Sequence, residues 1–264
     1  MTIINGVNLH YEVIGVGEPL LLVHGSWGDH HEYEQIMPAL AERFRVVSYD
    51  RRGHSASGPA TGSVSDDIAD AAALLEHLAL GPTHLFGACS FVPLWLAARR
   101  PDLVRSTCVH EPASFALLAA GAPQPPPAEA AALGMIREGR YEEAARTFFE
   151  QAVMGPGAWD QLPPPVRETF VRNAPTFAEE RGDPDAAFVD LDALADGGVP
   201  VRVTLGRLGD PSFAAVAERI GHAVPGAVVE TLPGGHAPHV THPAEFATSL
   251  IGWLTSVSAT SHTA

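Results

Sequence analysis

The chain has 264 residues, enough for one large α/β domain or for such a domain with an inserted cap. Hydrophobic residues make up 46% and charged residues 18%, a globular composition that excludes disorder as the main state. The 31 acidic and 16 basic residues give a net charge of −15, which repels phosphate backbones and anionic lipids. Neither nucleic acid nor a membrane is therefore an expected partner.

The two cysteines, Cys89 and Cys108, fall in separate apolar stretches. Such sparse cysteine use indicates a reducing compartment rather than a disulfide framework. Residues 1–6 contain neither a basic start nor a long apolar run, so we expect no signal peptide and no membrane anchor. These features predict a cytoplasmic protein.

Along the chain, apolar runs of strand length alternate with segments of helical periodicity. This pattern predicts a mostly parallel sheet with helices on both faces. A covering helix is expected over residues 66–78, with Ser65 available as an N-cap, and another over residues 92–99. The expected strands are residues 9–14, 20–23, 44–49, 84–88, 106–110, 201–205 and 228–232.

The alternation stops in the middle of the chain, where strand-like runs vanish and prolines cluster. This stretch is too long for one loop in a compact domain, and helical patterns occur at residues 128–137 and 141–153. We therefore expect a core domain of residues 1–112 and 199–264 with residues 113–198 inserted as a helical cap. Residues 255–264 are expected to form a frayed polar tail.

Candidate active-site residues follow the ends of several predicted strands. One strand runs into the turn His24-Gly25-Ser26, whose backbone N–H groups can face a developing oxyanion, and Trp27 beside it is a candidate substrate-binding residue. A second strand is followed by the charged loop 50–55, which suits a bracing role.

A third strand ends in small residues at the start of a helix. A nucleophile at this junction lies on a sharp turn, where the helix dipole and free N–H groups favour an anion.

In their order along the chain, these motifs resemble those of the α/β-hydrolase family from about residue 20 to residue 253. The likeness comprises the His24-Gly25 turn, the loop 50–55, an elbow beginning at Gly87, a cap, a late acid and a final histidine. The resemblance implies the α/β-hydrolase fold and a cofactor-independent enzyme with a nucleophile, an acid and a histidine in that chain order.

The elbow departs from the family's Gly-x-Ser-x-Gly pattern, because residues 87–91 read GACSF. In an ungapped comparison, Cys89 takes the place of the nucleophile. A small deletion would instead place Ser90 there, but Ala88 and Val92 would then flank it where the turn needs minimal side chains. We therefore favour Cys89 and keep Ser90 as the alternative.

The candidate base is His236, which follows the last strand and two glycines at the family's position. Two carboxylates compete to orient it. Asp210 lies where most family members carry their acid and is favoured, whereas Glu111 lies at the position of a minority. The N–H groups of Ser26 and Ser90 would form the oxyanion hole.

His236, His239 and His242 also form a His-x-x-His-x-x-His pattern. We expect no metal there, because Pro238 and Pro243 break the regular geometry that such spacing needs. Neither a metal nor an organic cofactor is predicted.

The leading hypothesis is a hydrolase, or an enzyme similar to an acyltransferase, that acts on a small ester, thioester or lactone through a Cys-His-acid site. Dehalogenation and epoxide hydrolysis are disfavoured, because the family members that perform them use an elbow aspartate. A lyase or cyclase without a covalent step is the alternative that the altered elbow suggests. A ligand-binding homologue without turnover is the alternative that Phe91 in place of glycine suggests. The sequence carries no signal for an oligomeric state.

Overall fold

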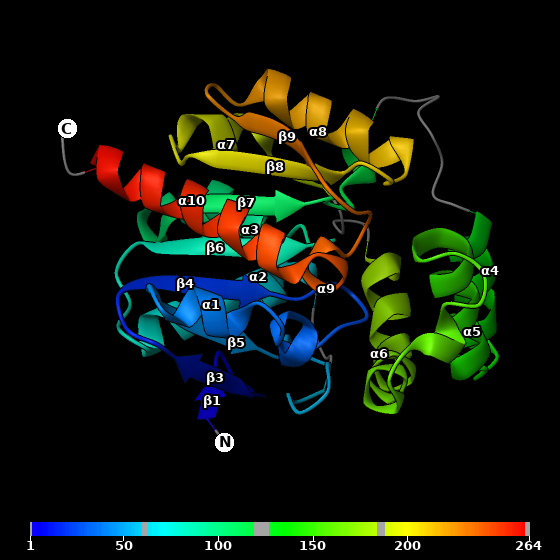
Figure 1. Ribbon diagram of the computed structural model, residues 1–264. Coiled ribbons are helices and arrows are strands. Elements are labelled where there is room, and N and C mark those ends of the chain that lie inside the picture. Colours follow the sequence, from blue (N-terminus) through cyan, green and yellow to red (C-terminus); the bar gives the residue numbers. More distant parts are fainter. Residues whose placement is uncertain (1, 60–62, 119–126, 184–187, 262–264) are drawn as a thin grey trace.

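A computed structural model describes residues 2–59, 63–118, 127–183 and 188–261. Seven strands form one sheet in the order β3-β5-β4-β6-β7-β8-β9, and all neighbours run parallel except β3, which is antiparallel to β5 (Figure 1). A separate hairpin pairs β1 (Thr2–Ile4) with β2 (Val7–Leu9). The sheet strands are β3 (Tyr11–Ile14), β4 (Glu18–Val23), β5 (Phe44–Tyr49), β6 (Thr83–Ala88), β7 (Val104–His110), β8 (Val201–Gly206) and β9 (Val228–Leu232).

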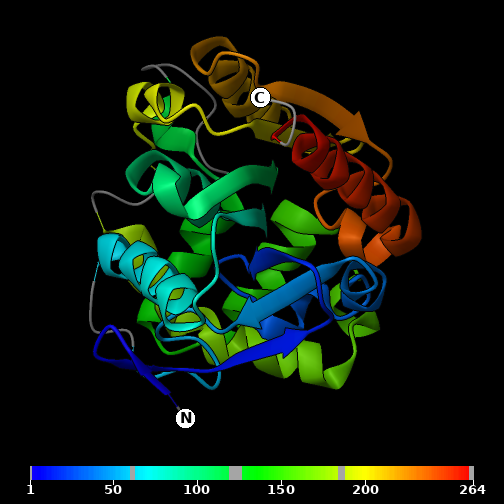
Figure 2. The ribbon, with the colours of Figure 1, turned by 90° about the vertical axis from the view of Figure 1, so that its left-hand side faces the viewer.

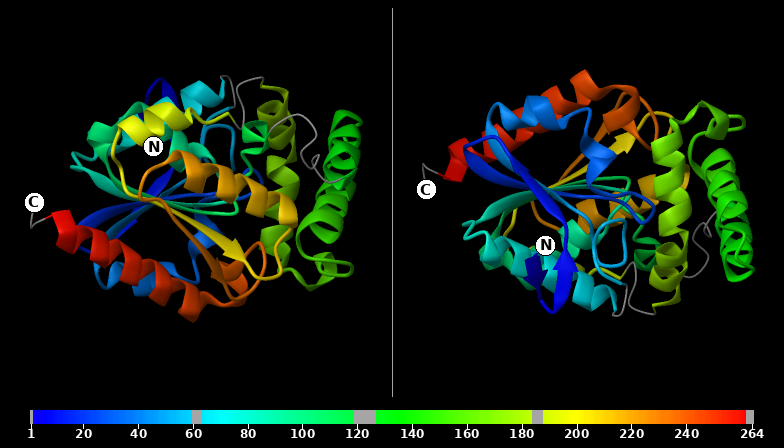
Figure 3. Two further views of the ribbon diagram at one scale, coloured as in Figure 1. Left: turned by 90° about the horizontal axis from the view of Figure 1, so that it is seen from above. Right: turned by 90° about the horizontal axis from the view of Figure 1, so that it is seen from below.

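Helices cover both faces of the sheet because its strands alternate between two apolar cores. In β4, Leu20 and Leu22 face one core, while Leu21 and Val23 face the other. The right-hand view of Figure 3 shows α1 and α10 on the side opposite α2. The first core contains α1 (Met37–Ala41) and α10 (Pro243–Ser261), and the second contains α2 (Val64–His77), α3 (Val92–Arg99), α7 (Leu191–Asp196) and α8 (Pro211–Ala223).

A helical segment at the carboxyl ends of the parallel strands has an apolar cluster of its own. It contains α4 (Pro127–Arg137), α5 (Tyr141–Phe148), a π-helical turn (Phe149–Val153), a 3-10 turn (Trp159–Gln161) and α6 (Pro164–Gly182). Figures 1 and 3 show α6 between the core and the outer pair α4 and α5. The view from the opposite end places α10 in front and these helices behind (Figure 2).

Short helical elements complete the described chain. They are the 3-10 turns η1 (His30–Tyr33), η2 (Pro101–Leu103) and η3 (Phe115–Leu117), together with the short helix α9 (Pro238–Thr241). No helix among the described residues combines the length and apolar character that crossing a bilayer requires.

The structure confirms the predicted fold class and differs from the sequence expectations at several boundaries. The core that contains α2, α3, α7 and α8, here called the main core, also includes Phe115, Leu191 and Leu194. The helical segment with its own apolar cluster therefore begins after residue 113 and ends before residue 198. Ser63, not Ser65, caps α2 through a reciprocal pair of hydrogen bonds with Asp66.

The expected frayed tail is also wrong for residues 255–261. These residues continue α10, in which Leu254 packs into the core that contains α1 and Val257 is buried. Residues 262–264 of that expectation lie outside the described part of the chain.

Phe91 fills space between the elbow and the main core. Its side chain is 1% exposed, its ring centroid lies 6.2 Å from that of Trp95, and the Arg51 guanidinium lies 6.0 Å from its ring. Its φ of −93° lies in the right-handed helical region, so the backbone does not require glycine here.

We expect Phe91→Ala to lower the free energy of unfolding by about 3–5 kcal/mol, as for other buried phenylalanines, and Phe91→Gly to lower it at least as much. Urea denaturation measures both. Phe188→Ala, at a side chain that is 53% exposed, is the matched control and should change stability little. A Phe91→Gly protein as stable as wild type would contradict this packing role.

Candidate active site

The elbow between β6 and α3 holds Cys89 in a left-handed conformation with φ of +47°. Its N–H donates to the carbonyl oxygen of His110 at 2.8 Å. A Cβ added to Gly87 would lie 2.9 Å from Pro93 Cγ and 3.1 Å from the Val23 carbonyl oxygen, so the turn admits no larger residue there. The sharp turn leaves the Cys89 side chain partly exposed at the carboxyl edge of the sheet.

Ser90 occupies a different environment from Cys89. Its side chain is 2% exposed, and its buried hydroxyl has no hydrogen-bond partner among the described residues. The strained, accessible elbow position therefore belongs to Cys89, as the ungapped comparison predicts.

His236 lies beside Cys89 and contacts a carboxylate on its other side. Its Nδ1 lies 2.6 Å from Glu111 Oε2. Glu111 Oε1 accepts a hydrogen bond from the Gly206 N–H at 2.9 Å, and an added Cβ at Gly209 would lie 1.9 Å from this oxygen. The Phe213 ring stacks on His236 with centroids 5.1 Å apart. These contacts fix the position of the ring and leave Nε2 for the thiol.

Asp210, the favoured partner of His236 in the sequence analysis, has another role in the structure. Its Oδ1 accepts the Ser212 N–H at 2.8 Å as the N-cap of α8, with Pro211 at the first helical position. Among the described contacts, the carboxylate that meets His236 is that of Glu111. The preference for Asp210 is therefore wrong as a prediction of this contact.

The electrostatics of the pair favour a charged imidazolium. Burial alone would lower the pKa of His236, but the Cys89 thiolate and then the Glu111 carboxylate outweigh it and raise the pKa to about 10. Burial would raise the pKa of Glu111, whereas its hydrogen bond and charge interaction with His236 hold it below the usual value. His236 and Glu111 thus stabilise each other in their charged forms.

The turn after β4 approaches the elbow closely. An added Cβ at Gly25 would lie 3.6 Å from Cys89 Cβ and 3.2 Å from the Ala88 carbonyl oxygen. Among the described hydrogen bonds, none has the N–H of Ser26 or Ser90 as its donor. Both groups are therefore available for an oxyanion beside the thiol.

Two histidines brace this turn. The His24 Nε2 accepts the Arg51 N–H at 3.0 Å, so Nδ1 carries the proton and donates to the Gly25 carbonyl oxygen at 2.7 Å. Burial, then the neighbouring His54 and Arg51, lower the pKa of His24 well below its usual value and keep the ring neutral. His54 Nε2 lies 3.2 Å from the Ser26 carbonyl oxygen.

A glutamate from α6 completes the turn, and the sequence analysis did not identify it. Glu180 Oε1 accepts the Ser26 hydroxyl at 2.5 Å, and its Oε2 accepts from Arg51 Nη2 at 2.7 Å. Arg51 also donates through Nε to Asp67 at 2.6 Å. Because Glu180 comes from the part least similar to the family, no motif marks it in the sequence.

Glu32 is a second carboxylate that the sequence analysis missed. It accepts the Gly25 N–H at 3.0 Å, and its other oxygen lies 3.8 Å from His239 Nε2. Burial raises the pKa of Glu32 to about 7, against the lowering effect of the Gly25 N–H. This contact turns the Gly25 amide toward η1 and away from the oxyanion position.

A cleft of about 470 Å³ opens beside the histidine. The core side contributes Glu111, His236, Asp210 and Phe213, and the π-helical turn of the helical segment contributes Glu150. Trp27, the candidate substrate-binding residue, is not among the residues that line this cleft, and neither is Cys89. Trp27 is 5% exposed and packs in the helical segment, with its ring centroid 4.5 Å from that of Phe177.

The three histidines of the His-x-x-His-x-x-His pattern do not form a ligand set. Burial, then the charges of His110 and His236, lower the pKa of His239 to about 3. Clusters of at least three potential metal ligands occur at two places within the described residues, and neither includes His236, His239 or His242.

The sheet order, the left-handed elbow and the histidine–carboxylate pair define the α/β-hydrolase class. The family model "Alpha/beta hydrolase family" matches residues 20–249, and the chain belongs to this family. The resemblance seen in the sequence is thus confirmed.

Among curated proteins, the chain is 39% identical over 119 residues to the uncharacterized hydrolase YraK of Bacillus subtilis (strain 168), covering 43% of this chain and 44% of YraK. It is 25% identical over 263 residues to the zearalenone hydrolase of Cladophialophora bantiana, covering 92% of this chain and 91% of that enzyme. The matches to the first three curated relatives span less than half of each relative's length. The enol-lactonase from Burkholderia xenovorans LB400 has the same fold, with a TM-score of 0.81 at 21% identity over 96% of this chain and 99% of that one.

We expect Cys89→Ala to lower the pKa of His236, because the substitution removes the thiolate that contributes most to raising it. The wild-type ring should keep its proton up to about pH 10, and the variant ring should release it at a clearly lower pH. Histidine NMR titration measures this. Cys108→Ala is the control. Burial raises the pKa of Cys108 to about 12, and Cys108 lies in the core that contains α1 and α10 rather than at the elbow. An unchanged His236 titration in Cys89→Ala would contradict the assigned contact.

Proposed function

We propose that this protein is a cofactor-independent hydrolase of a small ester, thioester or lactone, with Cys89 as its nucleophile. One observation carries the proposal: a cysteine on the left-handed elbow lies beside a histidine whose far nitrogen contacts a buried carboxylate. This arrangement matches the nucleophile–base–orienting acid logic of acyl transfer.

In the first half-reaction, the Cys89 thiolate attacks the substrate carbonyl carbon and the carbonyl electrons move to oxygen. The backbone N–H groups of Ser26 and Ser90 stabilise this oxyanion. As the tetrahedral intermediate collapses, the C–O or C–S bond breaks and the His236 imidazolium gives its proton to the leaving group. The product is a thioester between the acyl group and Cys89, with a neutral histidine.

In the second half-reaction, neutral His236 removes a proton from water as the water attacks the thioester. Collapse of the second intermediate releases the carboxylic acid and restores the thiolate–imidazolium pair. Glu111 stabilises the imidazolium in both resting and intermediate states. An amine or alcohol in place of water would give acyl transfer through the same steps.

We propose that the helical segment acts as a cap over the cleft and selects the substrate. Its π-helical turn contributes Glu150 to the lining that also contains Glu111, Asp210 and His236. Three carboxylates and one imidazolium give this lining a net negative charge, which disfavours an anionic substrate, so we propose a neutral acyl compound.

We expect Cys89→Ala to abolish hydrolysis of an activated ester, while Ser90→Ala retains a large part of it. His236→Ala and the double variant Cys89→Ala/His236→Ala should lower the rate by about as much as Cys89→Ala alone. The reason is that the effects of substitutions within one catalytic unit are strongly non-additive. Initial rates measure this, and the intact mass after brief incubation with a panel of esters and lactones should show an acyl adduct on Cys89.

Other outcomes would overturn the covalent mechanism in different ways. Activity lost in Ser90→Ala and kept in Cys89→Ala would move the nucleophile to Ser90. Product formed by Cys89→Ala at the wild-type rate but lost in His236→Ala would indicate a lyase or cyclase. Ligand-induced thermal stabilisation without product in any variant would indicate a binding protein.

We expect Glu111→Gln to lower kcat by about 10²–10⁴-fold, the range for loss of a carboxylate that orients a catalytic histidine. Asp210→Asn, the matched control, keeps an N-cap oxygen for α8 and should change kcat little. Both are measured with the same activated ester, and both proteins are checked for folding by circular dichroism. A larger loss in Asp210→Asn than in Glu111→Gln would return the acid to Asp210.

A further inference from the structure

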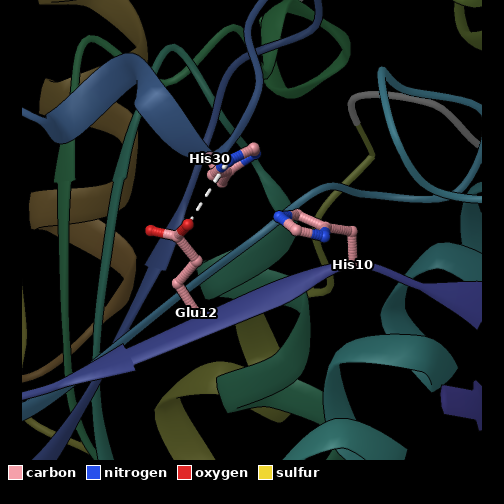
Figure 4. Close-up of side chains that lie close together, drawn as sticks. All are labelled: His10, Glu12 and His30. Atoms are coloured by element: carbon pink, nitrogen blue, oxygen red, sulfur yellow. Dashed lines mark ion pairs between the residues drawn. The ribbon is translucent and has the colours of Figure 1, made fainter. Parts of the chain in front are cut away.

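A cluster of three metal-ligand side chains lies at the edge of the sheet, away from the cleft. Glu12 comes from the edge strand β3, His10 lies two residues before it, just ahead of that strand, and His30 comes from the start of η1 (Figure 4). One potential ligand atom from each of the three lies within 4.8 Å of the others. His30 Nε2 is 4.0 Å from Glu12 Oε1, and the rings of His10 and His30 have centroids 4.4 Å apart.

A buried carboxylate fixes the orientation of His30. Nδ1 of His30 lies 2.6 Å from Asp50 Oδ1, and the same oxygen accepts the His30 N–H at 2.8 Å. Asp50 is fully buried, and its other oxygen accepts the Ala56 N–H at 2.9 Å. With Nδ1 donating to this carboxylate, Nε2 is turned toward Glu12. Metal-bound histidines are oriented by a carboxylate in this same way.

The other two side chains come from adjoining positions of one segment. His10 directly precedes β3 and Glu12 lies on it, and Figure 4 shows both side chains on the same side of the chain. The backbone of His10 is fixed at both ends: its N–H donates to the Ser57 hydroxyl at 3.0 Å, and its carbonyl oxygen accepts the Asp50 N–H at 2.9 Å. The Glu12 carboxylate is 53% exposed and is free to move toward the two rings.

We propose that His10, Glu12 and His30 bind one zinc ion, with water in the remaining position. Two imidazole nitrogens and one carboxylate oxygen form a donor set that zinc takes in proteins, and the net charge of −15 favours a cation. Bonds of about 2.0–2.2 Å in a tetrahedral site place ligand atoms about 3.4 Å apart, so the cluster must contract by roughly 1 Å. The side-chain torsions of Glu12 and of the half-buried His10 allow this movement. The sequence analysis predicted no metal and considered only the late histidines. It had no means of finding this set of ligands, because the strand and η1 meet only in the folded chain.

A neighbouring cluster of Asp29, His30 and His31 is less suited to a metal. Asp29 Oδ1 already accepts the His31 N–H at 3.0 Å, and Oδ2 accepts the hydroxyls of Ser55 and Thr169 at 2.9 and 3.1 Å. Binding a metal there would break these contacts, whereas the His10–Glu12–His30 set keeps its supporting hydrogen bonds.

The proposed site would link β3 to the segment that follows the oxyanion turn. Its support does not depend on the proposed hydrolase activity, since none of the three ligands contacts the cleft. The experiment therefore reads metal binding and not turnover.

Zinc titration calorimetry on the full-length, tag-free protein tests the proposal. All proteins carry Cys89→Ala, which removes the only partly exposed thiol as a competing ligand. We expect one equivalent of zinc to bind with a Kd in the micromolar range or below. His10→Gln and Glu12→Gln should each weaken binding by about 100-fold, while His31→Gln, the matched control, should leave it unchanged. Zinc should also raise the melting temperature of the parent and not of His10→Gln.

Three results would overturn the proposal. Zinc binding that survives His10→Gln and is lost in His31→Gln would place the metal on the Asp29 cluster. Binding that is insensitive to all three variants would place it elsewhere. The absence of one-equivalent binding in a parent protein whose circular dichroism shows a folded structure would exclude the site.

Discussion

The left-handed backbone at Cys89 is the constraint on which the site depends. A non-glycine residue in this conformation costs roughly 1–2 kcal/mol, so the surrounding structure must hold it there. The Cys89 N–H bond to His110, the missing side chain of Gly87 and the close approach of Gly25 do so together. The same turn brings the thiol beside His236 and leaves the next amide, that of Ser90, without an acceptor among the described hydrogen bonds.

The phenylalanine in the elbow does not damage it, because Phe91 has a right-handed helical backbone and a space of its own between Trp95 and Arg51. Within the elbow, the left-handed backbone lies at Cys89 and not at Phe91. The chain can therefore carry Phe91 where the family pattern has glycine and still keep the elbow geometry at Cys89. It also weakens the case for a homologue that has lost turnover.

Sequence periodicity located the sheet well, because buried strands such as β5 and β6 are largely apolar runs of the right length between turns. It kept both Glu111 and Asp210 as candidate acids and favoured Asp210, since β7 and β8 are neighbours and each is followed by a carboxylate at the same edge of the sheet. The Asp210-Pro211 pair carried a usable signal: aspartate before proline at the start of a helix is typical of an N-cap. Glu180 and the histidines of the edge cluster gave no such signal, because only tertiary contacts bring them to their partners.

The helical segment and the oxyanion turn share one buried network. Glu180 holds both the Ser26 hydroxyl and the Arg51 guanidinium, and Arg51 in turn binds Asp67 of α2. Buried ion pairs contribute little net stability, because desolvating the charges offsets their attraction, but losing one partner leaves the others unpaired. The main effect of Glu180 is therefore to fix the positions of Ser26 and Arg51, rather than to add to the stability of the fold. Because Glu180 of α6 holds both the Ser26 hydroxyl and the Arg51 guanidinium, a single carboxylate fixes the helical segment relative to the turn after β4.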